Sequence, residues 1–273
     1  MFIEERHEAI LRTLHEHGKV KVRDLSEKFQ VTDDCIRKDL KVLENAGCLK
    51  RTYGGAILSQ DYPLDRDVVD RRNVNVEKKA AIAEKALGLI RDNETIFLDI
   101  STTNIKLAEL LVEKHRRVVV VSNMIDILQV LAKSPLITAV GTGGIMYQTV
   151  NGFMGAAAME MIRQYSFDRA FVGTCGLDLT DASITTLGVE DGLTKRTALQ
   201  SSRHKYIVME KDKFYFNDSY KFAHFDDIDG IISDETPDPA TVSVLENAGV
   251  FKQDEAGQAA FVRFMEKAGF KKV

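Results

Sequence analysis

Residues 31–57 read VTDDCIRKDLKVLENAGCLKRTYGGAI, and this stretch decides the fold of the first part of the chain. Thr32 is a good N-cap for a helix, and the two aspartates after it occupy the first turn, where acidic groups complement the helix dipole. Ile36, Leu40 and Leu43 recur at helical spacing and give the helix an apolar stripe. The stretch therefore predicts an amphipathic helix with a capped start, followed by a hairpin.

Two shorter helices are predicted before this helix. The first stops at Gly18, and the second begins at Val22 and has Phe29 near its end. The apolar stripe of the first helix consists of Ile3, Ile10, Leu11 and Leu14. The third helix is expected to end at 45–47, and the hairpin to consist of strands 48–53 and 56–58 with a turn at 54–55. This order of elements indicates a winged helix-turn-helix.

The polar face of the third helix carries the chemistry for DNA. Arg37, Lys38 and Lys41 lie away from the apolar stripe, and such side chains contact guanine edges or phosphates. Lys50 and Arg51 in the hairpin suit the phosphate backbone. The residues predicted to contact double-stranded operator DNA are Thr32, Asp34, Cys35, Arg37, Lys38, Lys41, Lys50, Arg51 and Tyr53.

Two of these residues allow two interpretations each. Asp34 either compensates the helix dipole or accepts a hydrogen bond from N4 of a cytosine. Cys35 is either a small buried hydrophobic residue or a contact to DNA.

Composition and charge favour a globular protein of two domains. The chain has 273 residues, of which 44% are hydrophobic and 29% charged, and its net charge is −4. Residues 19–58 carry nine Lys or Arg against six Asp or Glu, so this segment has a net charge of +3 and the remainder has −7. Neither a signal peptide nor a transmembrane run is recognisable. Three cysteines without metal-ligand spacing indicate no zinc site and no disulfide framework, so a cytoplasmic protein is expected.

From residue 77 onward, helices and strands alternate, which predicts an α/β fold with a parallel sheet covered on both faces. Helices are expected at 77–90, 104–113, 124–132, 155–162, 193–201, 240–248 and 256–267. Strands are expected at 95–99, 118–121, 137–140, 169–172, 206–209 and 230–233. The polar segment 59–75 is interpreted as a linker between a DNA-binding domain (1–58) and a sensor and oligomerisation domain (76–273).

Four loops that follow predicted strands carry groups suited to an anion. In parallel sheets, ligands bind at the carboxyl ends of the strands, where helix N-termini and loop amides converge. Lys213 offers a flexible cation, and Ser101 and Thr102 offer hydroxyl donors at the start of a helix. The residues predicted to bind an effector are Asp99, Ser101, Thr102, Thr103, Asn104, Ser122, Asn123, Gly143, Gly144 and Lys213.

The stretch from Arg6 to Ile57 resembles the N-terminal domain of the DeoR family of bacterial regulators. The resemblance rests on Val31-Thr32, Ile36–Leu40, Leu43, Gly47, Leu49, Arg51 and Gly54–Ala56. Three residues depart from the family pattern: Thr32, Cys35 and Lys38 stand where the family usually has Ser, Thr and Arg. Thr32 keeps the capping oxygen.

The resemblance continues to about Asp234. It is carried by Glu77-Lys78, Phe97–Asp99, Thr102-Thr103, Asn123, Gly143-Gly144, Gly155, Asp168, Phe171, Gly173, Gly176, Lys195-Arg196 and Lys213-Phe214. It implies a sensor domain similar in fold to ribose-5-phosphate isomerase and glucosamine-6-phosphate deaminase, with a phosphorylated sugar or related metabolite as effector. Asp99 and Asn123 are then expected to orient sugar hydroxyls. Departures are Ser101, Ser122, Asp191 and Glu210, where the family has Gly, Thr, Glu and Asp.

The expected function is a DNA-binding transcriptional regulator. A repressor of a sugar or carbohydrate operon, controlled by a phosphorylated sugar, is expected, and activation is the alternative mode. Because a single winged helix reads one half-site, at least a homodimer is expected. Neither a cofactor nor a metal is expected.

Two other classes of function compete with this one. A sugar-phosphate isomerase or deaminase would need a general base, for which Asp168, Asp178, Glu190 and Asp191 are candidates. No compact catalytic motif surrounds them, and a DNA-binding domain would be idle in a metabolic enzyme. A regulator whose sensor serves for oligomerisation alone is the third alternative, against which the polar loops argue.

Overall fold

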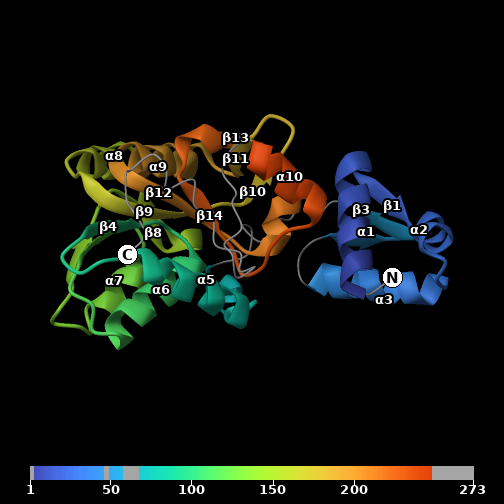
Figure 1. Cartoon of the computed structure of the whole chain (residues 1–273), viewed down its shortest axis with the longest axis horizontal. Helices are drawn as coiled ribbons and strands as arrows, with labels where there is room; N and C mark the ends of the chain where they lie inside the picture. The colour runs from blue at the N-terminus through green and yellow to red at the C-terminus, as the bar shows by residue number, and fades with distance from the viewer. Residues whose placement is uncertain (1–2, 46–48, 58–67, 248–273) are drawn as a thin grey trace. The chain divides into compact units, whose positions relative to one another are not determined.

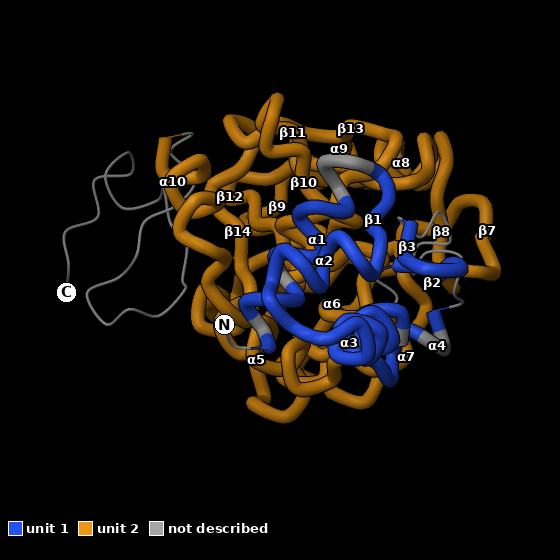
Figure 2. The backbone as a smooth tube through the Cα atoms, turned by 90° about the vertical axis from the view of Figure 1, so that its right-hand side faces the viewer, with its two compact units in different colours: residues 1–74 blue, residues 75–273 orange. Residues whose placement is uncertain are grey.

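The computed structural model describes residues 3–45, 49–57 and 68–247 of the chain. It divides into two compact units, residues 1–74 and 75–273, which Figure 2 draws in different colours. The expected end of the third helix beyond Asn45, most of the linker 59–75 and the helix expected at 256–267 lie outside the described residues. The domain limits drawn from the sequence at residues 58 and 75 stay predictions.

The first unit contains the three predicted helices and a small sheet. Its elements are α1 (Ile3–His17), β1 (Lys19–Lys21), α2 (Val22–Phe29), α3 (Asp33–Asn45), β2 (Lys50–Thr52), β3 (Gly55–Ile57) and α4 (Val68–Arg72). The apolar stripes are buried as predicted, except that Ile3 is 57% exposed at the start of α1. The three helices and the β2–β3 hairpin confirm the winged helix-turn-helix.

The strand β1 was not predicted, and it converts the hairpin into a three-stranded sheet in the order β1-β3-β2. Val20 is its one buried residue and pairs with Ala56. A glycine is required at position 55, because a Cβ there would lie 2.0 Å from the carbonyl oxygen of Val20. The sheet therefore ties the wing to the chain between α1 and α2.

The second unit is built on a six-stranded parallel sheet in the order β14-β12-β9-β4-β5-β6. Its strands are β4 (Thr95–Leu98), β5 (Val119–Ser122), β6 (Thr138–Gly141), β9 (Phe167–Gly173), β12 (Ser202–Val208) and β14 (Gly230–Ile232). All six were predicted, but β12 begins four residues and β9 two residues earlier than expected, whereas the other ends differ by at most one residue. Phe97, Phe167 and Phe171 on the central strands are fully buried.

Helices cover both faces of this sheet, as Figure 1 shows. One face is covered by α5 (Val76–Leu89), α6 (Thr102–Glu113) and α7 (Ile125–Leu131), and the other by α8 (Ala156–Arg163) and α9 (Val189–Gln200). The chain then continues into α10 (Pro239–Asn247). This arrangement confirms the predicted α/β architecture. Among the described residues, no helix is long and apolar enough to cross a membrane.

Several short elements were not predicted. A second, antiparallel sheet consists of β10 (Gly176–Asp178), β11 (Ser183–Thr186) and β13 (Tyr220–His224). A hairpin consists of β7 (Ile145–Tyr147) and β8 (Gly152–Met154). Three 3-10 helices are η1 (Gln148–Val150), η2 (Lys211–Tyr215) and η3 (Phe225–Asp227). Most of these elements lie after the carboxyl ends of the main strands, where they enclose the loops predicted to bind a ligand.

Candidate functional site

The helix α3 presents a charged face to solvent. Its start is capped as predicted, because the backbone N–H of Cys35 donates to Thr32 Oγ1 at 3.2 Å. Ile36, Leu40 and Leu43 are buried, whereas Arg37, Lys38 and Lys41 are exposed. Cys35 is partly exposed, so it is not the small buried hydrophobic residue of the first interpretation.

Arg37 is paired with the acidic residues at the start of the same helix. Its Nη1 donates to Asp34 Oδ1 at 2.7 Å, and Nη2 lies 3.8 Å from Asp33 Oδ2. The side chains of Arg37 and Asp34 are 57% and 81% exposed, so this ion pair contributes little to stability. Both partners remain accessible to a ligand that approaches the helix.

The wing is fastened to α3 through Arg51. Its backbone N–H and its Nε donate to the two oxygens of Glu44 at 2.9 and 2.6 Å. These hydrogen bonds hold the pKa of Glu44 below its usual range. Lys50 and Tyr53 are exposed, and Tyr53 precedes the left-handed Gly54 at the tip of the hairpin. Arg51 thus orients the wing, and a phosphate contact would compete with Glu44.

Asp39 was not among the predicted contacts, and it faces inward. Arg6 Nε and Nη2 donate to its two oxygens at 2.6 and 3.0 Å, and His7 Nε2 lies 3.1 Å from Oδ1. Burial alone would raise the pKa of Asp39, but the bonds from Arg6 and His7 outweigh it and lower the pKa. This buried pair fixes α1 against α3 and so supports the exposed face.

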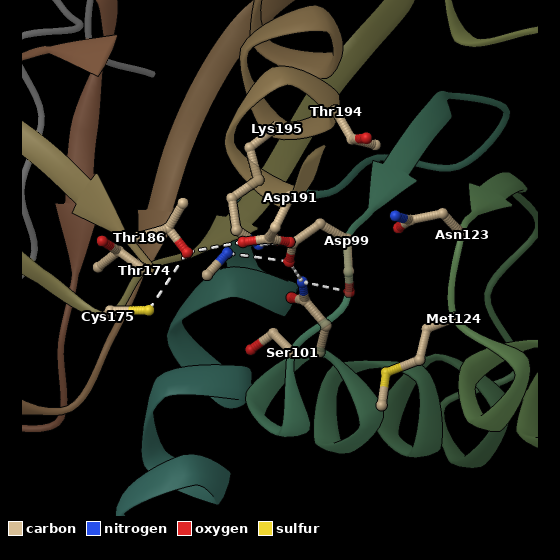
Figure 3. Close-up of polar contacts among 12 residues, drawn as sticks. Asp99, Ser101, Asn123, Met124, Thr174, Cys175, Thr186, Asp191, Thr194 and Lys195 are labelled. Carbon is tan, nitrogen blue, oxygen red and sulfur yellow. Dashed lines mark hydrogen bonds and ion pairs between the residues drawn. The ribbon is translucent and has the colours of Figure 1, made fainter. Parts of the chain in front are cut away.

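In the second unit, Asp99 lies where the carboxyl ends of β4 and β9 meet. Its Oδ1 accepts hydrogen bonds from the backbone N–H of Gly173 at 2.9 Å and from Asn104 Nδ2 at 2.7 Å. Its Oδ2 accepts one from Lys195 of α9 (Figure 3). Burial raises the pKa of Asp99, an effect that Lys195 partly offsets. Asp99 is therefore largely occupied in holding the site together.

Lys195 is fully enclosed between two carboxylates. Besides Asp99, it lies 3.1 Å from Asp191 one turn earlier on α9, and Thr186 Oγ1 donates to Asp191 Oδ2 at 2.7 Å. Burial alone would lower the pKa of Lys195, but Asp191 and Asp99 outweigh it and raise the pKa, so the amine stays charged. Lys195 was not predicted as a site residue, and Asp191 was named only as a candidate general base for the enzyme alternative. Their i, i+4 spacing was visible, but it does not reveal burial.

The helix α6 begins at Thr102, two residues earlier than predicted. Ser101 Oγ accepts a hydrogen bond from the backbone N–H of Thr103 at 3.3 Å, and Thr102 and Thr103 are buried. Asn104 is fully buried, and its amide donates to Asp99 O and Phe171 O at 3.3 and 2.8 Å. Its donors are thus used to join β4 to β9.

Gly173 allows the loop after β4 to come close. A Cβ at this position would lie 2.8 Å from the Cβ of Ser101, so a glycine is needed for the two strand ends to meet. Gly173 was noted in the resemblance but not as a site residue. The close approach places Ser101 directly above the end of β9.

Ser122 ends β5 and Asn123 follows it, next to this cluster in the sheet. Ser122 is fully buried, and its Oγ accepts from the backbone N–H of Met124 at 3.1 Å. Asn123 Nδ2 donates to the carbonyl of Phe153 in β8 at 3.0 Å. Among the described residues, no hydrogen-bond partner reaches Asn123 Oδ1, although this atom is buried. Asn123 therefore offers an acceptor to a ligand.

Gly143 and Gly144 follow β6, the edge strand, and take positive φ angles of 62° and 116°. A Cβ on Gly144 would lie 3.0 Å from Ala158 of α8, so this glycine lets the hairpin pack on that helix. In the described part of the chain, no hydrogen bond joins these glycines to Asp99. Their role in ligand binding stays a prediction.

Lys213 lies in η2 and reaches the other side of the cluster. Its Nζ donates to the carbonyl of Thr174 at 2.8 Å, directly after Gly173. No carboxylate of the described residues lies within ion-pair distance of Nζ. Cys175, beside it, is buried, and burial raises the pKa of its thiol. The positive charge of Lys213 is therefore available at the carboxyl end of the sheet.

A winged helix-turn-helix joined to an α/β unit with a charged strand-end site defines a DNA-binding regulator that responds to a ligand. The profile of the DeoR-like helix-turn-helix domain matches residues 6–61, and that of the DeoR C terminal sensor domain matches residues 74–235. The chain belongs to the DeoR family of transcriptional regulators. Because this family consists of regulators, the isomerase or deaminase alternative is set aside.

Curated relatives cover most of the chain. The uncharacterized regulator FruR of Bacillus subtilis is 32% identical over 78% of this chain and 84% of its own length. The lactose phosphotransferase system repressor of Lactococcus lactis is 31% identical over 86% of this chain and 92% of its own length. The glycerol-3-phosphate regulon repressor of Escherichia coli is 28% identical over 88% of this chain and 94% of its own length.

Solved structures share part of the fold. Ribose 5-phosphate isomerase A of Neisseria gonorrhoeae matches with a TM-score of 0.37 and 16% identity, over 50% of this chain and 52% of that one.

Proposed function

We propose that this chain represses a sugar-metabolism operon and that a phosphorylated sugar, bound at the carboxyl end of the sensor sheet, lowers its affinity for DNA. Two of the relatives are named as repressors, of the lactose phosphotransferase system and of the glycerol-3-phosphate regulon. Family membership supplies the DNA-binding and sensing domains. The identity of the ligand and the site residues are proposed from chemistry.

The charge of Lys213 is the observation that carries the ligand proposal. Its ammonium group donates to the carbonyl oxygen of Thr174, which is a neutral acceptor. A phosphate can take the place of this carbonyl and offer the ammonium group a charged acceptor. The N-terminus of α6 lies across the site at the end of β4, and its dipole favours an anion. Ser101 Oγ accepts from an amide and can still donate its own proton.

The sugar hydroxyls require acceptors and donors near the phosphate. Asn123 Oδ1 is buried and lacks a hydrogen-bond partner among the described residues, which costs free energy. A sugar hydroxyl that donates to this oxygen removes that cost. Asp99 already accepts three hydrogen bonds, so its main contribution is to hold Gly173 and Lys195 in place. Orientation of the sugar is therefore assigned to Asn123 ahead of Asp99.

Calorimetric titration with a panel of sugar phosphates tests the site. The panel contains ribose 5-phosphate, glucose 6-phosphate, fructose 1-phosphate, fructose 6-phosphate and glycerol 3-phosphate, each beside its unphosphorylated form. We expect one phosphorylated compound to bind and Lys213→Ala to weaken it at least about tenfold, the size of a charged hydrogen bond. Lys106→Ala on α6 removes a lysine that pairs with Glu109 and serves as control.

Three outcomes contradict the proposal. Binding of an unphosphorylated sugar with equal affinity would exclude a phosphate as the recognised group. Equal affinity of Lys213→Ala and the wild type for the phosphorylated compound would exclude Lys213 from the site. Turnover of a sugar phosphate by the purified protein would restore the enzyme alternative.

We also propose that the chain acts as a homodimer or larger oligomer through residues 76–273. One helix α3 can fill one major-groove half-site, whereas a two-fold symmetric pair matches a palindromic operator. Sedimentation at micromolar concentration is expected to give at least twice the chain mass of 30.6 kDa. A single species at the chain mass would contradict this.

A further inference from the structure

The segment Glu210–Lys213 contacts two different parts of the sensor unit. Lys213 at its end reaches the carbonyl of Thr174 in the candidate site. Glu210 and Asp212 instead contact residues at the start of α5, where the chain enters this unit. This four-residue segment therefore contacts both the candidate ligand site and the end of the linker.

The first contact involves Asn75, the first residue of the second unit. Asn75 Nδ2 donates to Glu210 Oε2 at 2.5 Å. The backbone of Asn75 is left-handed, with φ of 53°, and its carbonyl accepts from the N–H of Lys79 at 3.1 Å. Because Asn tolerates this conformation, the residue sets the direction in which the linker meets α5.

The second contact is an ion pair one turn into α5. Lys78 Nζ lies 3.0 Å from Asp212 Oδ2 and 3.9 Å from Asp234 Oδ2. Burial alone would lower the pKa of Lys78, but Asp212 outweighs it and the pKa is raised, so Lys78 stays charged. Asp234 Oδ1 also accepts from the N–H of Lys211 at 2.7 Å, which fastens the same segment.

Most of the segment lies in η2, whose 3-10 conformation has poorer hydrogen-bond geometry than an α-helix. η2 is a 3-10 helix of five residues, longer than the three or four residues that this geometry usually sustains. The Nζ of Lys213 donates to Thr174 O. A bound phosphate would offer Lys213 a stronger acceptor at another position, so η2 has two alternative anchors at Lys213, its middle residue.

We infer that Glu210–Lys213 is the relay through which effector binding changes the geometry of the linker at Asn75. The inference rests on the proposed function, because it requires an anion that draws Lys213 from Thr174. A shift of η2 moves Glu210 and Asp212, and these pull on Asn75 and Lys78 at the start of α5. Asn75 and Lys78 are then positioning residues: they transmit the state of the site without touching the ligand.

The test removes both contacts in the full-length chain and measures the coupling. DNA affinity is measured with and without the tightest sugar phosphate of the panel, on a duplex selected by the protein from a random-sequence pool. We expect the ratio of the two affinities to lie in the range of about 5- to 150-fold for the wild type and below about twofold for Asn75→Gly/Lys78→Met. Glycine keeps the left-handed backbone while it removes the side chain.

Matched controls separate the relay from a loss of stability. Asn93→Gly changes another asparagine whose φ angle is positive, 67°. Lys106→Met removes another helix-surface lysine that forms an ion pair, in this case with Glu109. Both controls should keep the wild-type ratio. Lys78→Arg, which preserves the charge opposite Asp212, should restore most of the coupling that Lys78→Met removes.

A second measurement does not depend on DNA. Hydrogen exchange of the amides at 75–80 should change when the sugar phosphate binds the wild type, and should not change in Asn75→Gly/Lys78→Met, while calorimetry gives both proteins the same ligand affinity. A double variant with wild-type coupling and exchange would overturn the relay alone. A double variant that binds the ligand less tightly would assign these residues to the site and also overturn the relay. A wild type that does not bind any sugar phosphate overturns the proposed function.

Discussion

The ion pair at the start of α3 is exposed to solvent, whereas the ion pair at the end of β4 is buried. On α3, Arg37 and Asp34 are paired in solvent, with side chains 57% and 81% exposed. At the end of β4, Lys195 and Asp99 are paired with side chains only 5% and 2% exposed. Exposed charges can exchange their partner for a phosphate or a base at little cost, whereas buried charges are costly to separate. The first arrangement suits contact with DNA, and the second suits a rigid, preformed group of polar side chains.

The largest expected effect comes from breaking the buried pair. Lys195→Met should lower the free energy of unfolding by about 3–5 kcal/mol, because it leaves Asp99 buried without its counter-charge. Urea unfolding of the full chain measures the change. The same substitution at the partly exposed Lys106 should change stability by less than about 1 kcal/mol. Similar losses for both variants would mean that burial does not distinguish the two kinds of pair.

A smaller effect is expected on the DNA-reading side. Arg37→Ala should weaken binding to the selected duplex by about 1–3 kcal/mol while binding to random DNA changes less, if Arg37 reads a base edge. Lys50→Ala in the wing should weaken binding to both DNAs alike and reduce the salt slope by about one. Titrations at several salt concentrations provide both values. Equal losses on both DNAs for Arg37→Ala would assign this residue to the phosphate backbone.

The smallest expected effect is a difference in response to acid. The pKa of Asp39 is lowered in the folded state, so its contribution to stability is present above the ordinary carboxyl range and is lost as pH falls through the folded-state value. The pKa of Asp99 is raised, so its contribution changes in the opposite direction. The stability gap between the wild type and Asp39→Asn should therefore narrow as pH falls from 6 toward about 3. A gap that widens with acid would contradict the sign of the shift at Asp39.

The sequence predicted the elements that local patterns determine. The cap at Thr32 and the apolar spacing of α3 each depend on residues within one helix. The helices and strands that alternate after residue 77 likewise show their own hydrophobic periodicity, so the sequence alone predicts them. Strand β1 was missed because Val20 is its one apolar residue and pairing with β3 creates it. The sheet β10-β11-β13 was missed because its strands are only three to five residues long, and the tertiary fold places Leu177, Ile184 and Phe222 in the core beside α9.

Prediction of the site was limited by burial. The strand-end loops were predicted from composition, and Asp99, Ser101 and Asn123 do follow two adjacent strands, β4 and β5. Lys195 was missed because a lysine on a helix is normally expected in solvent, and only the tertiary fold places it between Asp99 and Asp191. Asn104 was predicted to bind a ligand. Its amide donors join two strands, but its buried Oδ1 has no hydrogen-bond partner among the described residues, so its role in ligand binding stays a prediction.

Reciprocal linkage tests the central claim most directly. The affinity of the wild type for its selected duplex is measured with and without the sugar phosphate, and the affinity for the sugar phosphate is measured with and without the duplex. If one equilibrium couples the two sites, both affinities must fall by the same factor. We predict equal factors greater than about fivefold. Independent binding of the two ligands, with both factors equal to one, would contradict the account.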